Sequence, residues 1–315
     1  MNITLSEISS LLHSKDNFYI LTHQYPDGDT LGSGFALCMA LQKMGKMAKV
    51  LCNDEIPKKY NILSNNIKTQ NFTPQYIISV DVADTQLLGE KLQQEYKDKI
   101  DLSIDHHSSG KNFAKFSYTE PDSAATAEII YALLNLMNVE IDKNIATCLY
   151  TGISTDTGCF KYANATARSY RIAADLLETG IDACGINRLM FDMKSRERLE
   201  IEREVLDSME FFYNNKCALV YTTLDMMKKA HVTDSDIEGL ASIPRQVEGV
   251  LIGITMREKK DGTFKISVRT DETISANLIC ERFGGGGHPC AGGCSIAGNL
   301  NEVKQKIINE IKDFI

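Results

Sequence analysis

The first half of the chain alternates short runs of β-forming residues with helical patterns, and this alternation restricts the fold more than any other feature of the sequence. Alternation of this kind is typical of βα units arranged around a parallel sheet. In open sheets of this class, ligands bind at the carboxyl ends of the strands. We expect strands at 18–23, 46–52, 76–83 and 101–107, and helices at 29–45, 121–139, 144–154 and 166–180, with Thr166 as an N-terminal cap and Gly45 and Gly180 as C-terminal caps.

The pattern changes after residue 215 and predicts a second, smaller α/β domain with an antiparallel component. Its signals are a strand at 217–224, a hairpin over 249–270 with its turn at "KKDGT", and helices at 223–241, 274–283 and 299–315. The charged, mostly helical segment 181–213 is interpreted as a helix that bridges the two domains. We therefore predict an α/β chain with an N-terminal parallel-sheet domain at 1–185, a helical linker at 186–214 and the second domain at 215–315.

Size and charge limit the partners that we expect. At 315 residues the chain is long enough for two domains, each with a core of its own. A net charge of -8 argues against binding to long nucleic acid, which depends on neutralising many phosphates, and leaves a short anionic substrate open. The sequence has no run of ~18 or more apolar residues and no secretory signal pattern, so we expect a cytoplasmic protein without membrane contact.

Nine cysteines at irregular spacings predict reduced thiols rather than a disulfide framework. Cys38, Cys148 and Cys217 lie in apolar segments and are expected in the core. Four side chains near the C-terminus could hold zinc, although their spacing matches no common zinc finger: Cys280, His288, Cys290 and Cys294.

Polar side chains gather where the expected strands end. The first strand ends at His23 within "LTHQYPDGDTLGSG", and the third strand runs into Asp81. The fourth strand ends in "DHH", and a further aspartate lies in "YTGISTDTGCF". Four carboxylates and two histidines in these segments suit manganese or magnesium, and they are His23, Asp27, Asp29, Asp81, His106 and Asp156. Six ligands are too many for one tetrahedral ion, and they suit two ions about 3.5 to 4 Å apart that share one carboxylate.

Each of these residues also has a structural explanation. Asp29 or Thr30 could cap the following helix, Asp81 could be a turn residue, and Asp84 is expected to cap the segment after it. A histidine at a strand end is more often structural than a metal ligand. The grouping of these residues at several element ends nevertheless favours the metal site over separate explanations.

Five ordered segments resemble one known family. "THQYPDGD", "SVDVADT", "IDHHS" and "TGISTDTGCF" resemble the four motifs of the DHH phosphoesterases, and "GGGGHPCAGG" resembles the glycine-rich motif of the DHH-associated C-terminal domain. The resemblance extends from about residue 15 to about residue 310, and within the superfamily the chain is most similar to the bacterial nanoRNases and pAp phosphatases. It implies two divalent ions, Mn²⁺ first, with Mg²⁺ or Co²⁺ as alternatives.

The resemblance also implies which ion each of the six expected ligands would bind. One ion would be held by His23, Asp27 and Asp81. The second ion would be held by Asp29, Asp81, His106 and Asp156, so that Asp81 bridges the pair and counts as catalytic.

Further roles follow for residues beside the ions and in the second domain. His107 would contact the scissile phosphate and stabilise charge in the transition state, and Asp105 would orient a histidine. A glycine run can be only a flexible loop, but its backbone N–H groups can also approach an anion closely. The implied substrate contacts are Arg269 and His288, with the glycines Gly285, Gly286 and Gly287 and with Arg245 as a further candidate.

The function implied by the resemblance is hydrolysis of short oligoribonucleotides and linear dinucleotides to mononucleotides, together with dephosphorylation of 3′-phosphoadenosine 5′-phosphate (pAp) to AMP. A cyclic-dinucleotide phosphodiesterase would use the same metal set. A type II inorganic pyrophosphatase would lack the GGGGH pattern, a long-strand exonuclease would need an added domain, and a non-catalytic nucleotide-binding protein should have lost ligands that are all present here. Short RNA and pAp are thus the expected partners, and the resemblance suggests a homodimer.

Overall fold

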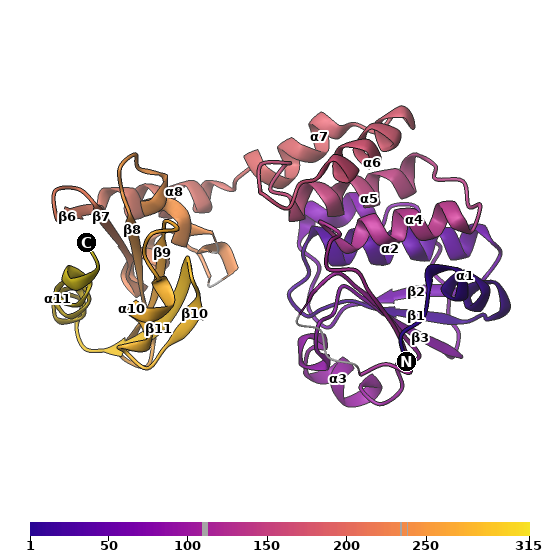
Figure 1. Cartoon of the computed structure of the whole chain (residues 1–315), viewed down its shortest axis with the longest axis horizontal. Coiled ribbons are helices and arrows are strands. Elements are labelled where there is room, and N and C mark those ends of the chain that lie inside the picture. The colour runs from indigo at the N-terminus through magenta and orange to yellow at the C-terminus, as the bar shows by residue number, and fades with distance from the viewer. Residues whose placement is uncertain (109–112, 234, 238) are drawn as a thin grey trace. The chain divides into compact units, whose positions relative to one another are not determined.

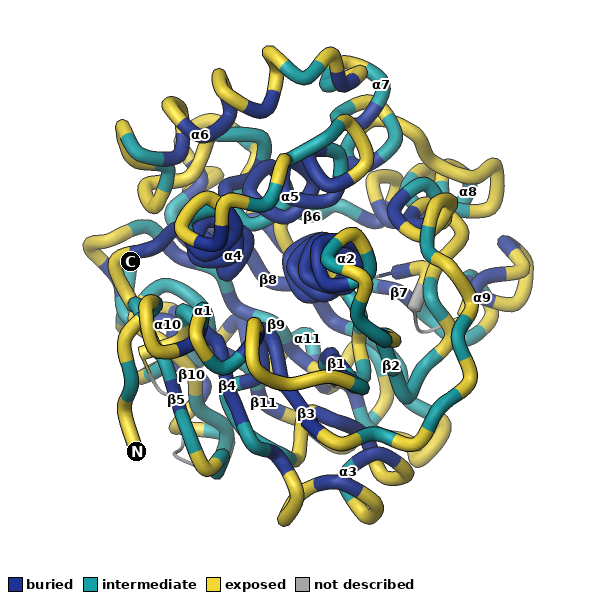
Figure 2. Tube along the Cα trace, turned by 90° about the vertical axis from the view of Figure 1, so that its right-hand side faces the viewer, coloured by how far each residue is buried: buried dark blue, intermediate teal, exposed yellow. Residues whose placement is uncertain are grey.

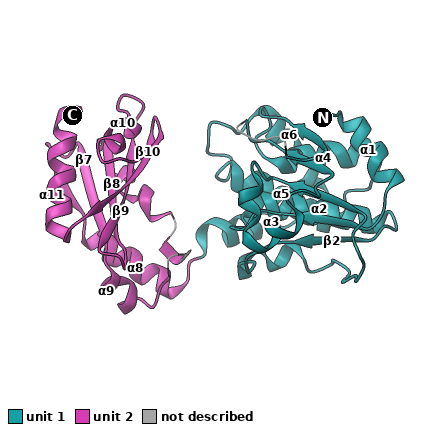
Figure 3. Ribbon diagram, turned by 90° about the horizontal axis from the view of Figure 1, so that it is seen from below, with its two compact units in different colours: residues 1–193 teal, residues 194–315 magenta. Residues whose placement is uncertain are grey.

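The protein forms two compact units, residues 1–193 and residues 194–315 (Figure 3). The computed structural model describes residues 1–108, 113–233, 235–237 and 239–315 (Figure 1). Each unit has its own sheet and its own hydrophobic core. Within the described ranges, every helix is too short or too polar to cross a membrane.

The sheet of the first unit has five strands, all parallel, in the order β2-β1-β3-β4-β5. The strands are β1 (Phe18–Leu21), β2 (Ala48–Leu51), β3 (Tyr76–Val80), β4 (Leu102–Asp105) and β5 (Phe116–Thr119). The predicted parallel sheet is confirmed, and four of its strands lie within the expected segments. The edge strand β5 was not expected, because a four-residue strand with one buried side chain has almost no periodic signal.

Helices cover both faces of this sheet. Figure 1 shows α2, α4 and α5 on one face and α3 on the other. The helices of this unit are α1 (Leu5–Ser14), α2 (Gly28–Lys43), α3 (Glu90–Tyr96), α4 (Thr126–Leu136), α5 (Lys143–Asp156), α6 (Ala167–Glu178) and α7 (Ala183–Asn187), with short helices η1 (Lys58–Leu63) and η2 (Thr85–Leu88). Thr166 caps α6 and Asp84 caps η2, as predicted. Gly45 and Gly180 lie one residue beyond the C-caps of α2 and α6.

The helix α2 is the centre of the first unit. All its residues from Gly28 to Leu41 are buried, and Figure 2 shows it as a dark blue coil. Helix α5 packs tightly against it, because a Cβ atom on Gly32 would lie 2.4 Å from the carbonyl oxygen of Cys148. A Cβ atom on Gly152 would likewise lie 2.8 Å from a carboxylate oxygen of Asp29. The glycines therefore let α5 approach the carboxylate that the first turn of α2 carries.

The second unit has a six-stranded sheet in the order β10-β11-β9-β8-β7-β6, in which β7 and β8 are parallel and the other neighbours antiparallel. The strands are β6 (Glu210–Phe212), β7 (Cys217–Thr222), β8 (Ile252–Glu258), β9 (Thr263–Thr270), β10 (Gly286–His288) and β11 (Ala291–Ala297). The helices are α8 (Arg196–Asp207), α9 (Leu224–Lys229), α10 (Ala276–Glu281) and α11 (Leu300–Ile311). The expected strand at 217–224, the hairpin and the helices at 274–283 and 299–315 are thus present.

Two helical predictions are wrong. The expected helix at 223–241 ends as α9 at Lys229, because His231 adopts a left-handed backbone conformation, and short helices η4 (Ser235–Ile237) and η5 (Leu240–Gln246) follow. Residues 234 and 238 of that prediction lie outside the described residues. The segment 181–213 is also not one helix, since α7 continues into a π-helical turn, η3 (Arg188–Asp192), and α8 begins only at Arg196.

Candidate metal centre

The chain order of the first sheet places a topological switch point between β1 and β3. From β1 the chain moves outward to β2 and then returns to β3 on the opposite side of β1. Ligands of open α/β sheets bind at such a switch point, beyond the carboxyl ends of the strands. His23 lies two residues beyond β1, Asp81 follows β3 directly, and His106 follows β4 directly. The fold therefore carries all three residues to the same edge.

Asp27 is both a helix cap and a member of the polar cluster. Its Oδ1 accepts the backbone N–H groups of Asp29 and Thr30, each at 3.0 Å, and thereby caps α2. Its Oδ2 lies 3.5 Å from Nε2 of His23. The expectation that Asp29 or Thr30 caps the helix is therefore wrong, because the backbone of both residues is already within the first turn.

Asp29 is fully buried and held on both oxygens. Its Oδ2 accepts the backbone N–H of Thr126 at 2.6 Å, and its Oδ1 accepts that of Ala127 at 2.9 Å. The hydroxyl of Ser33 donates to Oδ1 at 3.2 Å. These amides are the first two of α4, where the helix dipole favours a negative charge. Sequence analysis missed this contact because a backbone N–H leaves no signal in residue type.

Asp81 lies between the two histidines of the cluster. Its Oδ2 lies 3.7 Å from Nε2 of His23, and its Oδ1 lies 3.6 Å from Nε2 of His106. The side chain is 3% exposed, and Oδ1 accepts a hydrogen bond from the hydroxyl of Thr126 at 3.0 Å. The backbone of Asp81 has φ of 59°, a left-handed conformation that is costly for a residue with a side chain. Strain of this kind persists where surrounding contacts hold it, as the Ile104 carbonyl does by accepting the Asp81 N–H at 2.9 Å.

His106 directs its Nε2 atom toward the carboxylates. Its Nδ1 is 3.1 Å from the carbonyl oxygen of Ser123, so Nδ1 carries the proton and donates it to that carbonyl. Its Nε2 lies 3.3 Å from Oδ2 of Asp156 and 4.0 Å from Oδ2 of Asp29. Asp156 is the last residue of α5, and its carbonyl oxygen accepts a hydrogen bond from Asn164 at 3.1 Å. The Nε2 atom of His106 is thus directed at the acidic cluster.

His107 and Asp105 form a hydrogen-bonded pair beside the cluster. Nδ1 of His107 donates to Oδ1 of Asp105 at 2.7 Å, and the backbone N–H of His106 donates to the same oxygen at 2.8 Å. The hydrogen bond to Asp105 raises the pKa of His107, although partial burial opposes the shift. The His107 side chain is 44% exposed, so this imidazole reaches solvent next to the carboxylates. The position of Asp105 is the one expected for a residue that orients a histidine.

The cluster divides into three overlapping groups whose ligand atoms lie within 4.8 Å of one another. The first group contains His23, Asp27 and Asp81, and the second contains Asp29, His106 and Asp156. A third group joins Asp81 to His106 and His107. The structure therefore brings all six predicted ligands and His107 together, with Asp81 common to two groups, and these side chains could bind metal.

Burial and mutual repulsion disfavour ionisation of three carboxyl groups in this cluster. Burial, followed by repulsion from neighbouring aspartates, raises the pKa of Asp81 well above its usual range and that of Asp156 to about 9. Burial also raises the pKa of Asp29 to about 6, against the attraction of His106. The pKa of Asp27 is lowered, because its interactions with His23 and the helix N-terminus outweigh burial. A bound cation would offset this repulsion, so the donor set fits divalent metal.

Two of the predicted substrate contacts, Arg269 and His288, are in register across the sheet of the second unit. Arg269 of β9 pairs with Ala291 of β11, which pairs with His288 of β10. Paired residues project from the same face, so the two side chains start about 10 Å apart, two strand spacings. Arg269 donates to its neighbour's carbonyl at 3.1 Å and His288 is exposed. Arg245 donates to the carbonyl of Val250, which gives it a structural partner.

The glycine-rich segment has a packing explanation in the structure. A Cβ atom on Gly285 would lie 2.2 Å from the carbonyl oxygen of Gly293, and one on Gly287 would lie 2.3 Å from that of Ala291. A Cβ atom on Gly286, by contrast, would make only an ordinary contact, 3.7 Å from the side-chain oxygen of Asn277. Close packing of β10 on β11 therefore requires two of the three glycines whether or not an anion binds there. The segment is an ordered strand pair rather than the flexible loop considered as an alternative.

The cysteines do not form the zinc site considered as an alternative. Cys280 and Cys294 lie in the buried core of the second unit, His288 is exposed, and the Cys290 thiol points to the carbonyl of Asp271 at 3.7 Å. No disulfide joins any of the nine cysteines, all of which the structure describes. As expected, Cys38, Cys148 and Cys217 are core residues.

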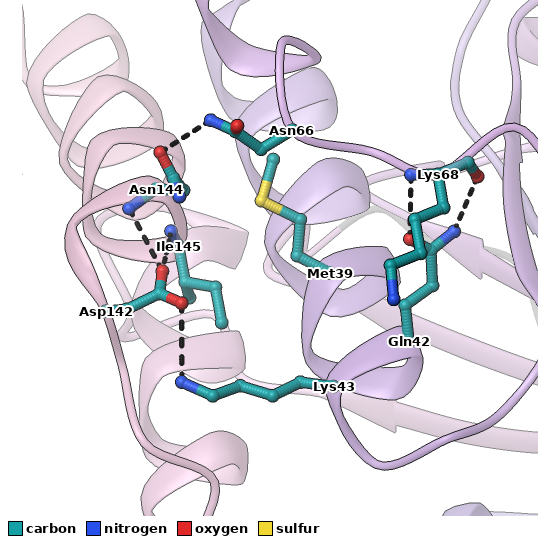
Figure 4. A pocket seen from close by; sticks show the side chains of 8 residues that line it. All are labelled: Met39, Gln42, Lys43, Asn66, Lys68, Asp142, Asn144 and Ile145. Carbon is teal, nitrogen blue, oxygen red and sulfur yellow. Dashed lines mark hydrogen bonds and ion pairs between the residues drawn. The ribbon is translucent and has the colours of Figure 1, made fainter.

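A separate cavity of about 220 Å³ lies near the other end of α2 (Figure 4). Its polar side chains are largely paired with one another. Asn66 donates to Asn144 at 2.7 Å, and Lys43 forms an ion pair with Asp142 at 3.3 Å. Gln42 exchanges two hydrogen bonds of 3.0 Å with the backbone of Lys68. These contacts join α2 to α5 and to the intervening loop, about 20 Å along α2 from Asp29.

Comparisons with known proteins agree with the geometry. The DHH family N-terminal domain matches residues 17–153, and the DHHA1 domain matches residues 215–315. The chain is 30% identical over 303 residues to the bifunctional oligoribonuclease and PAP phosphatase NrnA of Thermus thermophilus, covering 94% of this chain and 89% of that protein. It is 24% identical to the cyclic-di-AMP phosphodiesterase GdpP of Geobacillus thermodenitrificans, covering 98% of this chain but 49% of that protein.

One solved structure is similar along the whole chain. An exopolyphosphatase-related protein from Bacteroides fragilis superimposes with a TM-score of 0.85 at 26% identity, covering 98% of this chain and 96% of that one. The similarity therefore includes both domains. The chain belongs to the DHH family, with a DHH N-terminal domain followed by a DHHA1 domain.

Proposed function

We propose that the cluster at the end of the first sheet holds two divalent metal ions. His23, Asp27 and Asp81 would bind one ion. Asp29, His106 and Asp156 would bind the other, with Asp81 as a ligand of both because its Oδ1 lies 3.6 Å from Nε2 of His106. The observation that carries this proposal is the position of Asp81, whose two oxygens lie 3.7 and 3.6 Å from histidines of different groups. Oxygen and imidazole donors without thiolate favour Mn²⁺, with Mg²⁺ or Co²⁺ as alternatives.

We further propose that the protein is a hydrolase of short oligoribonucleotides and linear dinucleotides that also converts pAp to AMP. The cluster of potential metal ligands supports phosphate ester hydrolysis, and the similarity to NrnA over nearly the whole of both chains supports these substrates. Activity on a cyclic dinucleotide is the second candidate, supported by the match to GdpP. It is less well supported because the chain spans about half of GdpP.

The chain's own residues would bind and orient the scissile phosphate. Bound divalent ions supply an activated water nucleophile and Lewis-acid stabilisation of the phosphoryl oxygens. The imidazole of His107, whose pKa is raised by its hydrogen bond to Asp105, would donate a hydrogen bond to a phosphoryl oxygen, where negative charge increases in the transition state. Asp105 thus acts as a positioning residue for His107.

In the second unit, Arg269 and His288 would bind a phosphate of the substrate away from the scissile bond, and Arg245 would assist. The support is their shared face of the sheet. Arg245 packs over Gly253 of β8, where a Cβ atom would lie 2.8 Å from the Arg245 side chain, and Gly253 pairs with Arg269. Arg269 in turn is in register with His288 through Ala291. A planar guanidinium can donate two hydrogen bonds to one phosphate. Limiting the substrate to a few nucleotides would then follow from binding its two ends separately. A homodimer and a cytoplasmic location remain predictions from the sequence.

The test is an assay of the purified full chain with Mn²⁺. The substrates are pAp, a linear dinucleotide, a 5-mer RNA, a 24-mer RNA, cyclic di-AMP and pyrophosphate, each also tested with the Asp81→Ala variant. We expect turnover of pAp, the dinucleotide and the 5-mer, little turnover of the 24-mer, and loss of all activity in the variant. Activity confined to pyrophosphate, or activity that survives in Asp81→Ala, would contradict the proposal.

A further inference from the structure

The segment between Glu120 and Glu128, which connects β5 to α4, supplies backbone groups to the candidate metal centre. The carbonyl oxygen of Ser123 accepts the Nδ1 proton of His106 at 3.1 Å. At the end of the same segment, the first two N–H groups of α4 hold the carboxylate of Asp29 at 2.6 and 2.9 Å. The conformation of this segment therefore sets the direction of two predicted ligands from the same group.

Two glutamates fix the segment at its ends. Glu120 accepts hydrogen bonds from the hydroxyls of Tyr118 at 2.6 Å and Ser123 at 2.8 Å. Burial opposes its ionisation, but these hydrogen bonds and that of a nearby arginine lower the pKa of Glu120. Glu128 is fully buried, and its Oε2 accepts the backbone N–H of Ala124 at 3.4 Å. Each carboxylate thus holds a different part of the segment.

One arginine joins the two glutamates. Arg168, in the first turn of α6, donates through Nη1 to Glu120. Its Nε lies 3.6 Å from Oε2 of Glu128, and its Nη2 donates to the Glu128 carbonyl at 3.5 Å. The guanidinium therefore contacts both ends of the segment with different nitrogens, which the compact ammonium of a lysine would do less well. It also supplies a positive charge beside a buried carboxylate that would be costly without one.

We propose that Arg168 is a positioning residue for the metal centre. By joining Glu120 to Glu128, it holds the segment between them in the conformation in which Ser123 orients His106 and α4 orients Asp29. The proposal rests on the proposed metal site. Metal affinity depends on the residues that orient the ligands as well as on the ligands themselves.

The experiment compares Arg168→Gln and Arg168→Lys with Arg171→Gln, which changes an exposed arginine of the same helix. Mn²⁺ affinity is measured by titration calorimetry, metal-free thermal unfolding gives the stability, and kcat/KM for pAp is measured over a range of Mn²⁺ concentrations. We expect Arg168→Gln to weaken Mn²⁺ binding by about 10-fold, the lower end of the effect of altering a residue that orients a ligand. Arg168→Lys should lose less, and Arg171→Gln should match the wild type. Excess Mn²⁺ should restore activity to Arg168→Gln because all six ligands remain.

Several outcomes would overturn the positioning role. If Arg168→Gln melts at a lower temperature but binds Mn²⁺ as tightly as the wild type, Arg168 has a purely structural role and the positioning role is wrong. An equal loss in Arg171→Gln would do so as well. If Arg168→Gln does not fold, Glu120→Gln removes one of the two contacts and is tested by the same titration, with the same expected and contrary results. A wild type that binds no Mn²⁺ would instead refute the metal site itself.

Discussion

The candidate metal centre of the first unit and the predicted substrate contacts of the second unit are built in different ways. At the edge of the first sheet, Asp29 and Asp81 are almost completely buried, and each accepts hydrogen bonds from α4. In the second unit, Arg269 is half-buried and bonds only to a neighbouring carbonyl among the described residues, and His288 is exposed. The first region is a fixed arrangement of donors, whereas the second presents side chains that a ligand has to order.

This difference predicts different consequences of mutation. Loss of Asp29 or Asp81 should affect catalysis itself, because the one that remains cannot rearrange without breaking its hydrogen bonding to α4. Loss of an exposed contact should affect substrate binding and leave the metal centre unchanged.

The largest effect is expected for Asp81→Asn, which preserves shape but removes the charge shared by two groups of the cluster. We expect kcat on pAp to fall on the order of 10³-fold or more, which exceeds the typical loss from removing one transition-state donor. Circular dichroism and thermal unfolding of the variant serve as the control for folding. A variant that keeps more than a tenth of wild-type kcat would show that Asp81 is not shared between ions.

A smaller effect is expected for Arg269→Gln. A hydrogen bond from a guanidinium to a phosphate contributes ~1.5 to 3 kcal/mol, so kcat/KM should fall about 10- to 100-fold, mainly through KM. Mn²⁺ affinity should not change. Arg282→Gln is the matched control, because Arg282 already pairs with Glu310 and Asp313. Equal losses in both variants, or a loss of Mn²⁺ binding in Arg269→Gln, would remove the distinction between the two regions.

The smallest effect concerns the stability of the metal-free protein. Folding raises the pKa of Asp29 to about 6 and that of Asp156 to about 9, above the ordinary value of 3.8. The folded state therefore binds more protons than the unfolded state in this window, so the stability that these groups contribute is complete below about pH 4 and is lost as pH rises through 6 and 9.

Thermal unfolding of wild type and Asp156→Asn between pH 5 and pH 9 measures this loss, since the asparagine does not titrate. In the absence of metal, the melting temperature of the variant should rise relative to wild type as pH increases, and saturating Mn²⁺ should remove that trend for the wild type. A constant difference between the two proteins across the pH range would mean that Asp156 ionises freely without metal.

Much of the candidate site could be predicted from the sequence, because its ligands follow strands whose ends a parallel sheet must bring to one edge. His23, Asp81 and His106 are cases of this kind. The contacts that hold the ligands could not be predicted. The Ser123 carbonyl and the first amides of α4 act through the backbone, which any residue type offers, and Arg168 lies far from them in sequence.

The fold shows the same division. The central strand β3 is buried along its whole length and was found, whereas β5 and β10 are short edge strands with few buried side chains. The helix predicted at 223–241 was too long because the apolar spacing continues past Lys229, while the backbone of His231 turns away. Tertiary packing determined these regions more strongly than local periodicity.

The most direct measurement is the number of Mn²⁺ ions that each chain binds at equilibrium, determined by titration calorimetry on the metal-free wild-type protein with elemental analysis of the loaded protein. A dinuclear centre that shares Asp81 predicts two ions per wild-type chain and fewer than two in Asp81→Asn at the same free Mn²⁺ concentration. One ion or none in the wild type, or two ions bound equally well without the Asp81 carboxylate, would contradict it.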